Sequence, residues 1–191
     1  VAANNMMPFF PDINDKPFDP VAGATYLTRW TVDMNQNDED YKSVRLSEMI
    51  GEFPKIDDRF TGKKNRYGWM VVIDPSQPVE RKGGSAGGWV MNTLGFVDLE
   101  TGAEQKWWCG PVSSIQEPCF VPRSPDAAEG DGWIVMVCNR LEERGSDLLI
   151  FEATNIAKGP ICTINIPVRL RFGLHGNWAD ADRIKPLEKA A

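Results

Sequence analysis

The sequence predicts an all-β fold, and three observations lead to this prediction. Helix signals are scarce, because 14 prolines and 17 glycines divide the 191 residues into short segments. Several of these segments alternate apolar and polar residues with a period of two, which is typical of strands. A strand–turn–strand pattern also recurs along the chain. Helical structure is expected only in the tail, at residues 186–191, and in a turn after Thr154.

The recurring pattern predicts three hairpins with polar turns. Their strands are expected at residues 28–34 with 43–49, 94–99 with 104–108, and 148–151 with 161–166. The first strand belongs to an alternating stretch over residues 26–34, whereas residues 67–73 and 132–138 are near-continuous apolar runs that predict strands buried on both faces. The repeat is close to the ~50 residues of a propeller blade. Blades of a β-propeller are therefore favoured over a sandwich.

Composition and charge restrict the class of protein. With 42% hydrophobic and 25% charged residues, the chain reads as one soluble globular domain. A net charge of −6 argues against a nucleic-acid or anionic-membrane surface, and no apolar run approaches the roughly 18 residues of a membrane span. The four cysteines form no Cys-x-x-Cys pair, so we interpret them as reduced, mostly buried thiols of a cytosolic protein. Because the chain starts at Val1, we expect that residues precede it.

The candidate site centres on His175, the one histidine of the sequence. Either glycines hold it against closely packed backbone as a metal ligand, or it is a core histidine that donates to a carbonyl. Glu52, Glu117 and His175 each follow one predicted hairpin, and equivalent positions in successive blades converge on the propeller axis. The two carboxylates and the imidazole are therefore expected to meet near the centre. Alternatively, inner strands simply carry polar residues that face a wet channel.

Several segments together resemble the carotenoid cleavage oxygenase family, and within it the bacterial lignostilbene dioxygenase branch, to which isoeugenol-cleaving enzymes also belong. The segments are Pro-Phe-Phe-Pro-Asp at 8–12, Leu-Thr-Arg-Trp at 27–30, Glu-Phe-Pro-Lys-Ile-Asp at 52–57, Glu-Pro-Cys-Phe-Val-Pro-Arg at 117–123, Asp-Gly-Trp at 131–133 and Phe-Gly-Leu-His-Gly-Asn-Trp at 172–178. Each is weak alone, but their order and spacing are specific, and they extend over nearly the whole chain.

The resemblance implies a seven-bladed β-propeller with a non-haem Fe(II) on its axis, held by four histidines and supported by three glutamates. His175 matches the last iron ligand, and Glu52 and Glu117 match two of the supporting glutamates. The other three histidines have no counterpart here, so residues 1–191 would be the C-terminal portion of a single propeller domain, about three blades, with no separate second domain. The N-terminal part of the same enzyme would then be this chain's partner.

The reaction implied by the resemblance is O2-dependent cleavage of the central C=C bond of a stilbene or phenylpropenoid to aromatic aldehydes. Such a planar substrate needs an apolar slot, and the residues expected to line it are Met7, Phe9, Phe10, Phe53 and Leu174. Each of these could instead be plain core. An apocarotenoid cleavage oxygenase and a non-catalytic propeller that binds a ligand or protein remain as alternative functions. The sequence does not determine the oligomeric state, and a homo-oligomer is one of the options.

Overall fold

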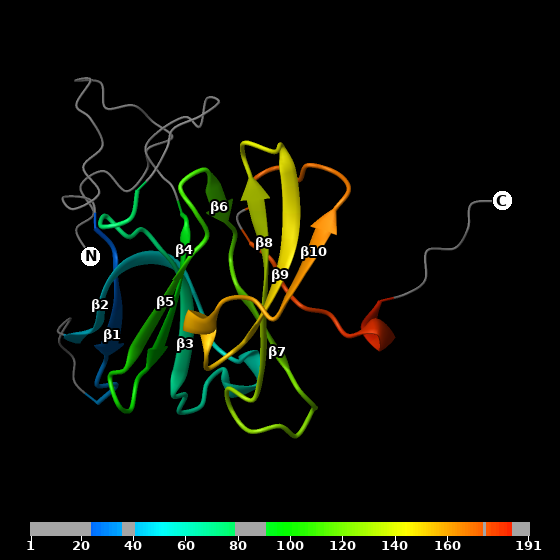
Figure 1. The fold of residues 1–191 in the computed structure, drawn as a ribbon. Helices are drawn as coiled ribbons and strands as arrows, with labels where there is room; N and C mark the ends of the chain where they lie inside the picture. Colours follow the sequence, from blue (N-terminus) through cyan, green and yellow to red (C-terminus); the bar gives the residue numbers. More distant parts are fainter. Residues whose placement is uncertain (1–23, 36–40, 79–90, 174, 185–191) are drawn as a thin grey trace.

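The computed structural model of the chain describes residues 24–35, 41–78, 91–173 and 175–184 (Figure 1). The helix expected at residues 186–191 and the proposed slot residues Met7, Phe9, Phe10 and Leu174 lie outside these ranges. Within them the regular structure consists of strands and three short 3-10 helices, η1 (Asp58–Phe60), η2 (Ile156–Lys158) and η3 (Ala181–Arg183). The all-β prediction is confirmed, as is the turn expected after Thr154, which is η2.

Two antiparallel sheets contain the strands. The first has the order β1-β2-β3-β4-β5 and the second the order β10-β9-β8-β6, with β7 also paired to β8. The strands of the first sheet are β1 (Tyr26–Thr31), β2 (Lys42–Lys55), β3 (Tyr67–Val72), β4 (Thr93–Asp98) and β5 (Glu104–Trp108). Those of the second are β6 (Ser113–Ile115), β7 (Cys119–Pro122), β8 (Gly132–Arg140), β9 (Gly145–Glu152) and β10 (Cys162–Ile166).

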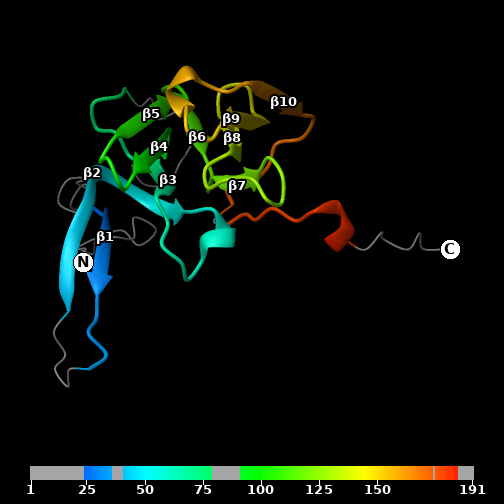
Figure 2. The same cartoon turned by 90° about the horizontal axis from the view of Figure 1, so that it is seen from below.

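All three predicted hairpins are present, as β1–β2, β4–β5 and β9–β10. The first differs in its bounds, because β2 is 14 residues long. Its first part pairs with β1 and its last part with β3, so the β1–β2 ribbon projects away from the second sheet (Figure 2). Glu52 therefore lies inside a strand instead of after the hairpin.

The main core lies between the two sheets. Trp69 of β3 stacks on Phe120 of β7, and its indole N–H donates to the carbonyl of Ala153 at 2.7 Å. The run in β3 is almost wholly buried, as predicted. The same prediction for β8 is wrong, because buried and half-buried residues alternate there. β8 has one face in the core and the other partly open to solvent, which is the usual pattern for an antiparallel strand.

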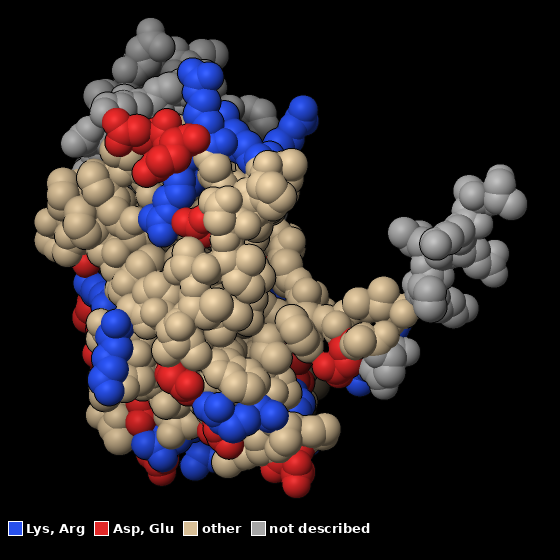
Figure 3. Space-filling model, turned by 45° about the vertical axis from the view of Figure 1, so that its right-hand side comes forward, with Lys and Arg blue, Asp and Glu red and all other residues tan. Residues whose placement is uncertain are grey.

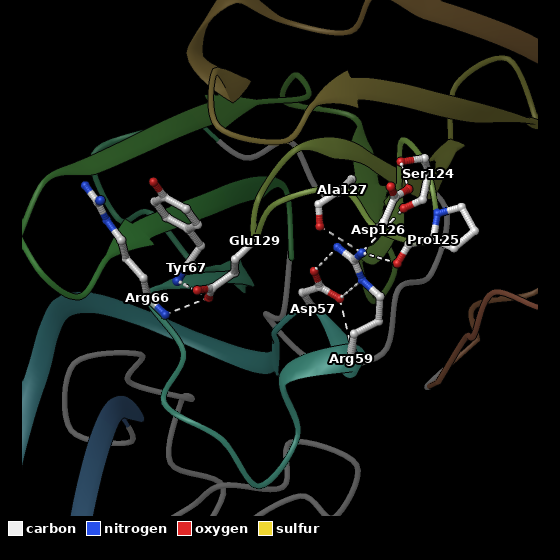
Figure 4. A network of polar contacts seen from close by, with 9 residues as sticks. All are labelled: Asp57, Arg59, Arg66, Tyr67, Ser124, Pro125, Asp126, Ala127 and Glu129. Carbon is white, nitrogen blue, oxygen red and sulfur yellow. Dashed lines mark hydrogen bonds and ion pairs between the residues drawn. The ribbon is translucent and has the colours of Figure 1, made fainter.

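The long loop between β7 and β8 is tied to the first sheet at two places (Figure 4). The guanidinium of Arg59, paired with buried Asp57, points into this loop and donates to the carbonyls of Pro125 and Ala127 at 3.0 Å each. Further along, the carboxylate of Glu129 accepts from the backbone N–H groups of Arg66, just before β3, and Tyr67, the first residue of β3. These contacts fix the two sheets to each other beside the end of β2.

β1 and β10, which each lie at one end of a sheet, both present apolar surface. On the β8–β10 side, the middle of the face carries few charged residues (Figure 3). Ile161 is 57% exposed and Ile164 of β10 is 47% exposed. On the opposite edge, Trp30 of β1 is exposed and contacts Tyr41. No helix in the described residues is long and apolar enough to cross a membrane.

The cysteine prediction is confirmed in part. All four are free thiols. Cys109 and Cys138 are buried, but Cys119 is half-buried and Cys162 is exposed. The expectation of mostly buried thiols is therefore wrong for Cys162, because β10 is an outer strand whose residues are largely open to solvent.

Candidate metal centre

The candidate centre forms where three segments meet: the end of β2, the turn between β6 and β7, and the extended segment that follows β10. β2 supplies Phe53 and Lys55, the turn supplies Glu117, and the last segment supplies His175. The turn and the last segment come from different parts of the second sheet, and β2 comes from the first. Packing of the two sheets is therefore what assembles these residues.

β2 enters the centre through a β-bulge. Its register with β3 shifts between Glu52 and Lys55, and Phe53 has φ 52, a left-handed conformation that L-residues rarely adopt. Such strain persists only where surrounding structure holds it. The bulge turns the ring of Phe53 edge-on to the imidazole of His175, with centroids 5.5 Å apart and an interplanar angle of 85°.

The segment that carries His175 has no regular structure of its own, and hydrogen bonds hold it at three points. The N–H of Leu170 donates to the buried hydroxyl of Ser146 at 3.0 Å. The side-chain amide of Gln116 donates to the carbonyl of Arg171 at 3.2 Å. The N–H of Gly176 donates to Oε2 of Glu117 at 2.8 Å. The position of His175 is thus set by the turn that contains Gln116 and Glu117.

Glu117 and His175 face each other directly. Oε1 of Glu117 lies 3.3 Å from Nδ1 of His175, while the Glu117 side chain is 7% exposed and the His175 side chain 75% exposed. When Nδ1–H donates to this carboxylate, Nε2 is the ring nitrogen that is left for another partner. His175 is therefore not a core histidine that donates to a carbonyl.

The expected packing of the flanking glycines against backbone is not found. A side chain at Gly173 would meet the amide oxygen of Gln116, which is the flexible end of a side chain and not backbone. A side chain at Gly176 would meet nothing within 4 Å. The contact that matters at Gly176 is its backbone N–H, which any residue except proline could supply.

Glu52 does not join the other two residues. It is half-buried, opposite Val71 in the β2–β3 pairing, and its carboxylate makes no hydrogen bond or ion pair to the part of the chain that the structure describes. Only the next residue, Phe53, packs on His175 among the ring contacts at this end of β2 in the described residues. The predicted convergence of three groups thus brings together Glu117 and His175 and leaves Glu52 without a bonded partner among the described residues.

Sequence reasoning missed Lys55 as a member of the centre. Its Nζ lies 3.7 Å from Oε2 of Glu117, and its side chain is 22% exposed. The charge of Lys55 also acts on Cys119: burial raises the pKa of that thiol, and Lys55 opposes the rise. Lys55 lies inside the motif at 52–57, but the motif gives no sign that its ammonium points to Glu117.

The residues present fit one imidazole ligand of a metal ion. Nε2 is the free nitrogen of His175, and a carboxylate on the other nitrogen is the usual way to fix the tautomer and orientation of a histidine ligand. Neutral imidazole suits borderline metals such as iron. The described residues bring no three of His, Cys, Asp or Glu together. This part of the chain can therefore contribute one ligand and its supporting carboxylate.

This fold, with a histidine oriented by a buried carboxylate, matches the class of carotenoid oxygenase propellers. The chain belongs to that family: the family model described as RPE65, Retinal pigment epithelial membrane protein, matches residues 2–180. The resemblance noted from the sequence is thereby confirmed.

Two relatives and one solved structure illustrate the similarity. Over 184 residues the chain is 52% identical to lignostilbene-alpha,beta-dioxygenase isozyme III of Sphingomonas paucimobilis, covering 96% of this chain and 38% of that protein. Over 176 residues it is 42% identical to isoeugenol monooxygenase of Pseudomonas nitroreducens, covering 92% and 37%. The crystal structure of Pseudomonas brassicacearum lignostilbene dioxygenase matches with a TM-score of 0.81 and 36% identity, covering 92% of this chain and 36% of that one.

These comparisons confirm the predicted fold class, part of a β-propeller. They also show that the chain spans less than two fifths of the length of the relatives it matches, 38% and 37% for the two named above.

Proposed function

We propose that this chain is the C-terminal part of an iron-dependent dioxygenase that cleaves the central C=C bond of a stilbene or phenylpropenoid with O2, giving aromatic aldehydes. The observation that carries the proposal is the pairing of Glu117 with Nδ1 of His175, which leaves Nε2 free to bind a metal. The names of the relatives, a lignostilbene dioxygenase and an isoeugenol monooxygenase, support this substrate class.

In this proposal His175 binds Fe(II) through Nε2, and Glu117 holds the ring and raises its basicity. Glu52 takes the equivalent role behind a histidine of the N-terminal part, which supplies the three further ligands. The Fe(II) held by these residues would supply the chemistry with O2 by which each alkene carbon becomes a carbonyl with one oxygen atom. The chain's own residues orient the ligand and shape the cavity, and no general base or nucleophile from this chain is required.

The substrate side of the centre would be apolar. Phe53 presents a ring beside the imidazole of His175, where it could form a wall for a planar aromatic substrate. Met7, Phe9, Phe10 and Leu174 complete the slot in this proposal.

Residues 1–191 would form one portion of a single propeller domain that closes with the preceding part of the enzyme. The exposed apolar residues on the outer strands β1 and β10 support this, because such surfaces normally lie against a neighbouring blade. We also propose a cytosolic location, supported by the four free cysteines.

The test uses the complete enzyme purified with iron. About one equivalent of iron per chain, and release of an aromatic aldehyde from a hydroxystilbene, would support the proposal. Cleavage of an apocarotenoid but not the hydroxystilbene would refute the substrate class. Absence of bound iron would refute the proposed enzymatic function and favour a non-catalytic propeller. His175→Ala should abolish iron binding, and retained iron in that variant would remove His175 from the site.

A further inference from the structure

Lys55 occupies a position that the supporting role of Glu117 does not by itself explain. The Glu117 carboxylate is nearly buried, and its Oε1 faces Nδ1 of His175 at 3.3 Å, whose own side chain is open to solvent. Its Oε2 accepts a hydrogen bond from the backbone N–H of Gly176, and the ammonium of Lys55 lies near the same oxygen. Burying an ionised carboxylate without a counter-charge is costly, and Lys55 is the cation that the described residues place beside it.

The geometry separates two ways in which Lys55 could act. A charge-assisted hydrogen bond has a length of about 2.7–2.9 Å, whereas Nζ of Lys55 is 3.7 Å from Oε2. Lys55 is therefore too far away for a strong directional bond and interacts mainly through its charge. The pair is shielded from water, since the two side chains are 22% and 7% exposed, so salt screens it less than a surface pair.

We infer that Lys55 is a positioning residue of the metal centre: its charge keeps the Glu117 carboxylate directed at His175 and thereby sets how tightly the completed centre holds iron. This inference rests on the proposed function. Gly176 and Lys55 together hold Oε2, which leaves Oε1 turned towards the imidazole. Without the ammonium, the carboxylate would gain by turning towards water, and the ring of His175 would lose its fixed orientation.

The experiment measures Fe(II) affinity of the complete enzyme by anaerobic competition with a chelator, without any assay of activity. Lys55→Met should weaken Fe(II) binding about tenfold, the lower end of the effect of an outer partner of a metal ligand. Lys55→Arg should retain near-wild-type affinity, because it keeps the charge. Lys55→Gln replaces Lys55→Met if the latter does not fold.

Lys106→Met is the matched control. Lys106 lies on β5, and its Nζ is 3.1 Å from the carboxylate of buried Asp74. This is also a lysine–carboxylate pair, but neither residue belongs to the candidate centre. This control should bind Fe(II) as the wild type does. In the Glu117→Gln background, Lys55→Met should add little further loss if Lys55 acts through Glu117.

A spectroscopic measurement separates positioning from general stability. With Co(II) in place of iron, the visible absorption bands should shift in Lys55→Met and stay as in wild type for Lys55→Arg and Lys106→Met. Wild-type affinity in Lys55→Met, or equal losses in Lys55→Arg or Lys106→Met, would overturn the inference. Failure of the wild-type enzyme to bind Fe(II) would instead refute the proposed function, so the two failures are distinguishable.

Discussion

Replacing Glu117 by glutamine tests the centre most directly, because the change keeps the shape of the side chain and removes its charge. The carboxylate accepts from two donors, the N–H of Gly176 at 2.8 Å and Nδ1 of His175 at 3.3 Å. Glutamine has one acceptor oxygen, so its amide group must face one of these donors. Losing a hydrogen bond to a charged group costs about 1.5–3 kcal/mol.

That cost predicts a measurable loss of metal affinity. Since about 1.4 kcal/mol corresponds to a factor of ten, Glu117→Gln should weaken Fe(II) binding about ten- to hundredfold. The assay is chelator competition on the complete enzyme, with aldehyde production normalised to bound iron. Glu129→Gln is the control, because Glu129 also accepts two backbone N–H groups, at the start of β3. An unchanged Fe(II) affinity in Glu117→Gln, or an equal loss in the control, would refute the assignment.

Three further predictions concern the surroundings of the centre and the fold. Phe53→Ala removes a ring that packs edge-on against the candidate ligand, so Fe(II) affinity should fall by about 0.5–1.5 kcal/mol in the same competition assay. Gly132→Ala should lower the free energy of unfolding by about 1–3 kcal/mol, because its Cβ would collide with the backbone of β7, whereas Gly145→Ala has open space and should not, as thermal melts would show. The hydrogen bonds from Arg66 hold the pKa of Asp98 below its usual range. The stability it contributes is therefore present above pH ~4 and lost as pH falls further, so Asp98→Asn should flatten the acid limb of urea-unfolding curves.

The hairpins could be predicted from the sequence because their signals are local. Polar turns and period-two alternation lie within a few residues of each other, and all three hairpins form, the first with different bounds. The extension of β2 could not be predicted in the same way. Glycine and proline, here Gly51 and Pro54, usually end a strand. The pairing of β2 with β3 nevertheless continues through them, across a bulge whose left-handed Phe53 is stabilised by tertiary contacts.

The candidate site shows the same division between local and tertiary information. The spacing of Glu117 and His175, together with the motifs around them, predicted two residues that the structure brings face to face. Lys55 and Gln116 lie in or beside those motifs, yet their contacts depend on how two sheets and the last segment pack. A lysine at the end of a strand is usually solvated, so nothing local distinguishes Lys55 from its exposed counterparts.

Glu117 and His175 differ strongly in exposure, and this difference bears on how the proposed centre would be shared between this chain and the rest of the enzyme. The carboxylate is nearly buried within this chain, with its partners Lys55 and Gly176 both supplied here, while three quarters of the imidazole surface is open. A histidine that served only the stability of this chain would gain more by packing its ring inward. Under the proposed function, contacts within this chain orient the ring, and its open Nε2 side is left for residues of the preceding part of the enzyme. Mutations of Lys55 or Glu117 should therefore act on metal binding more than on the folding of these two sheets.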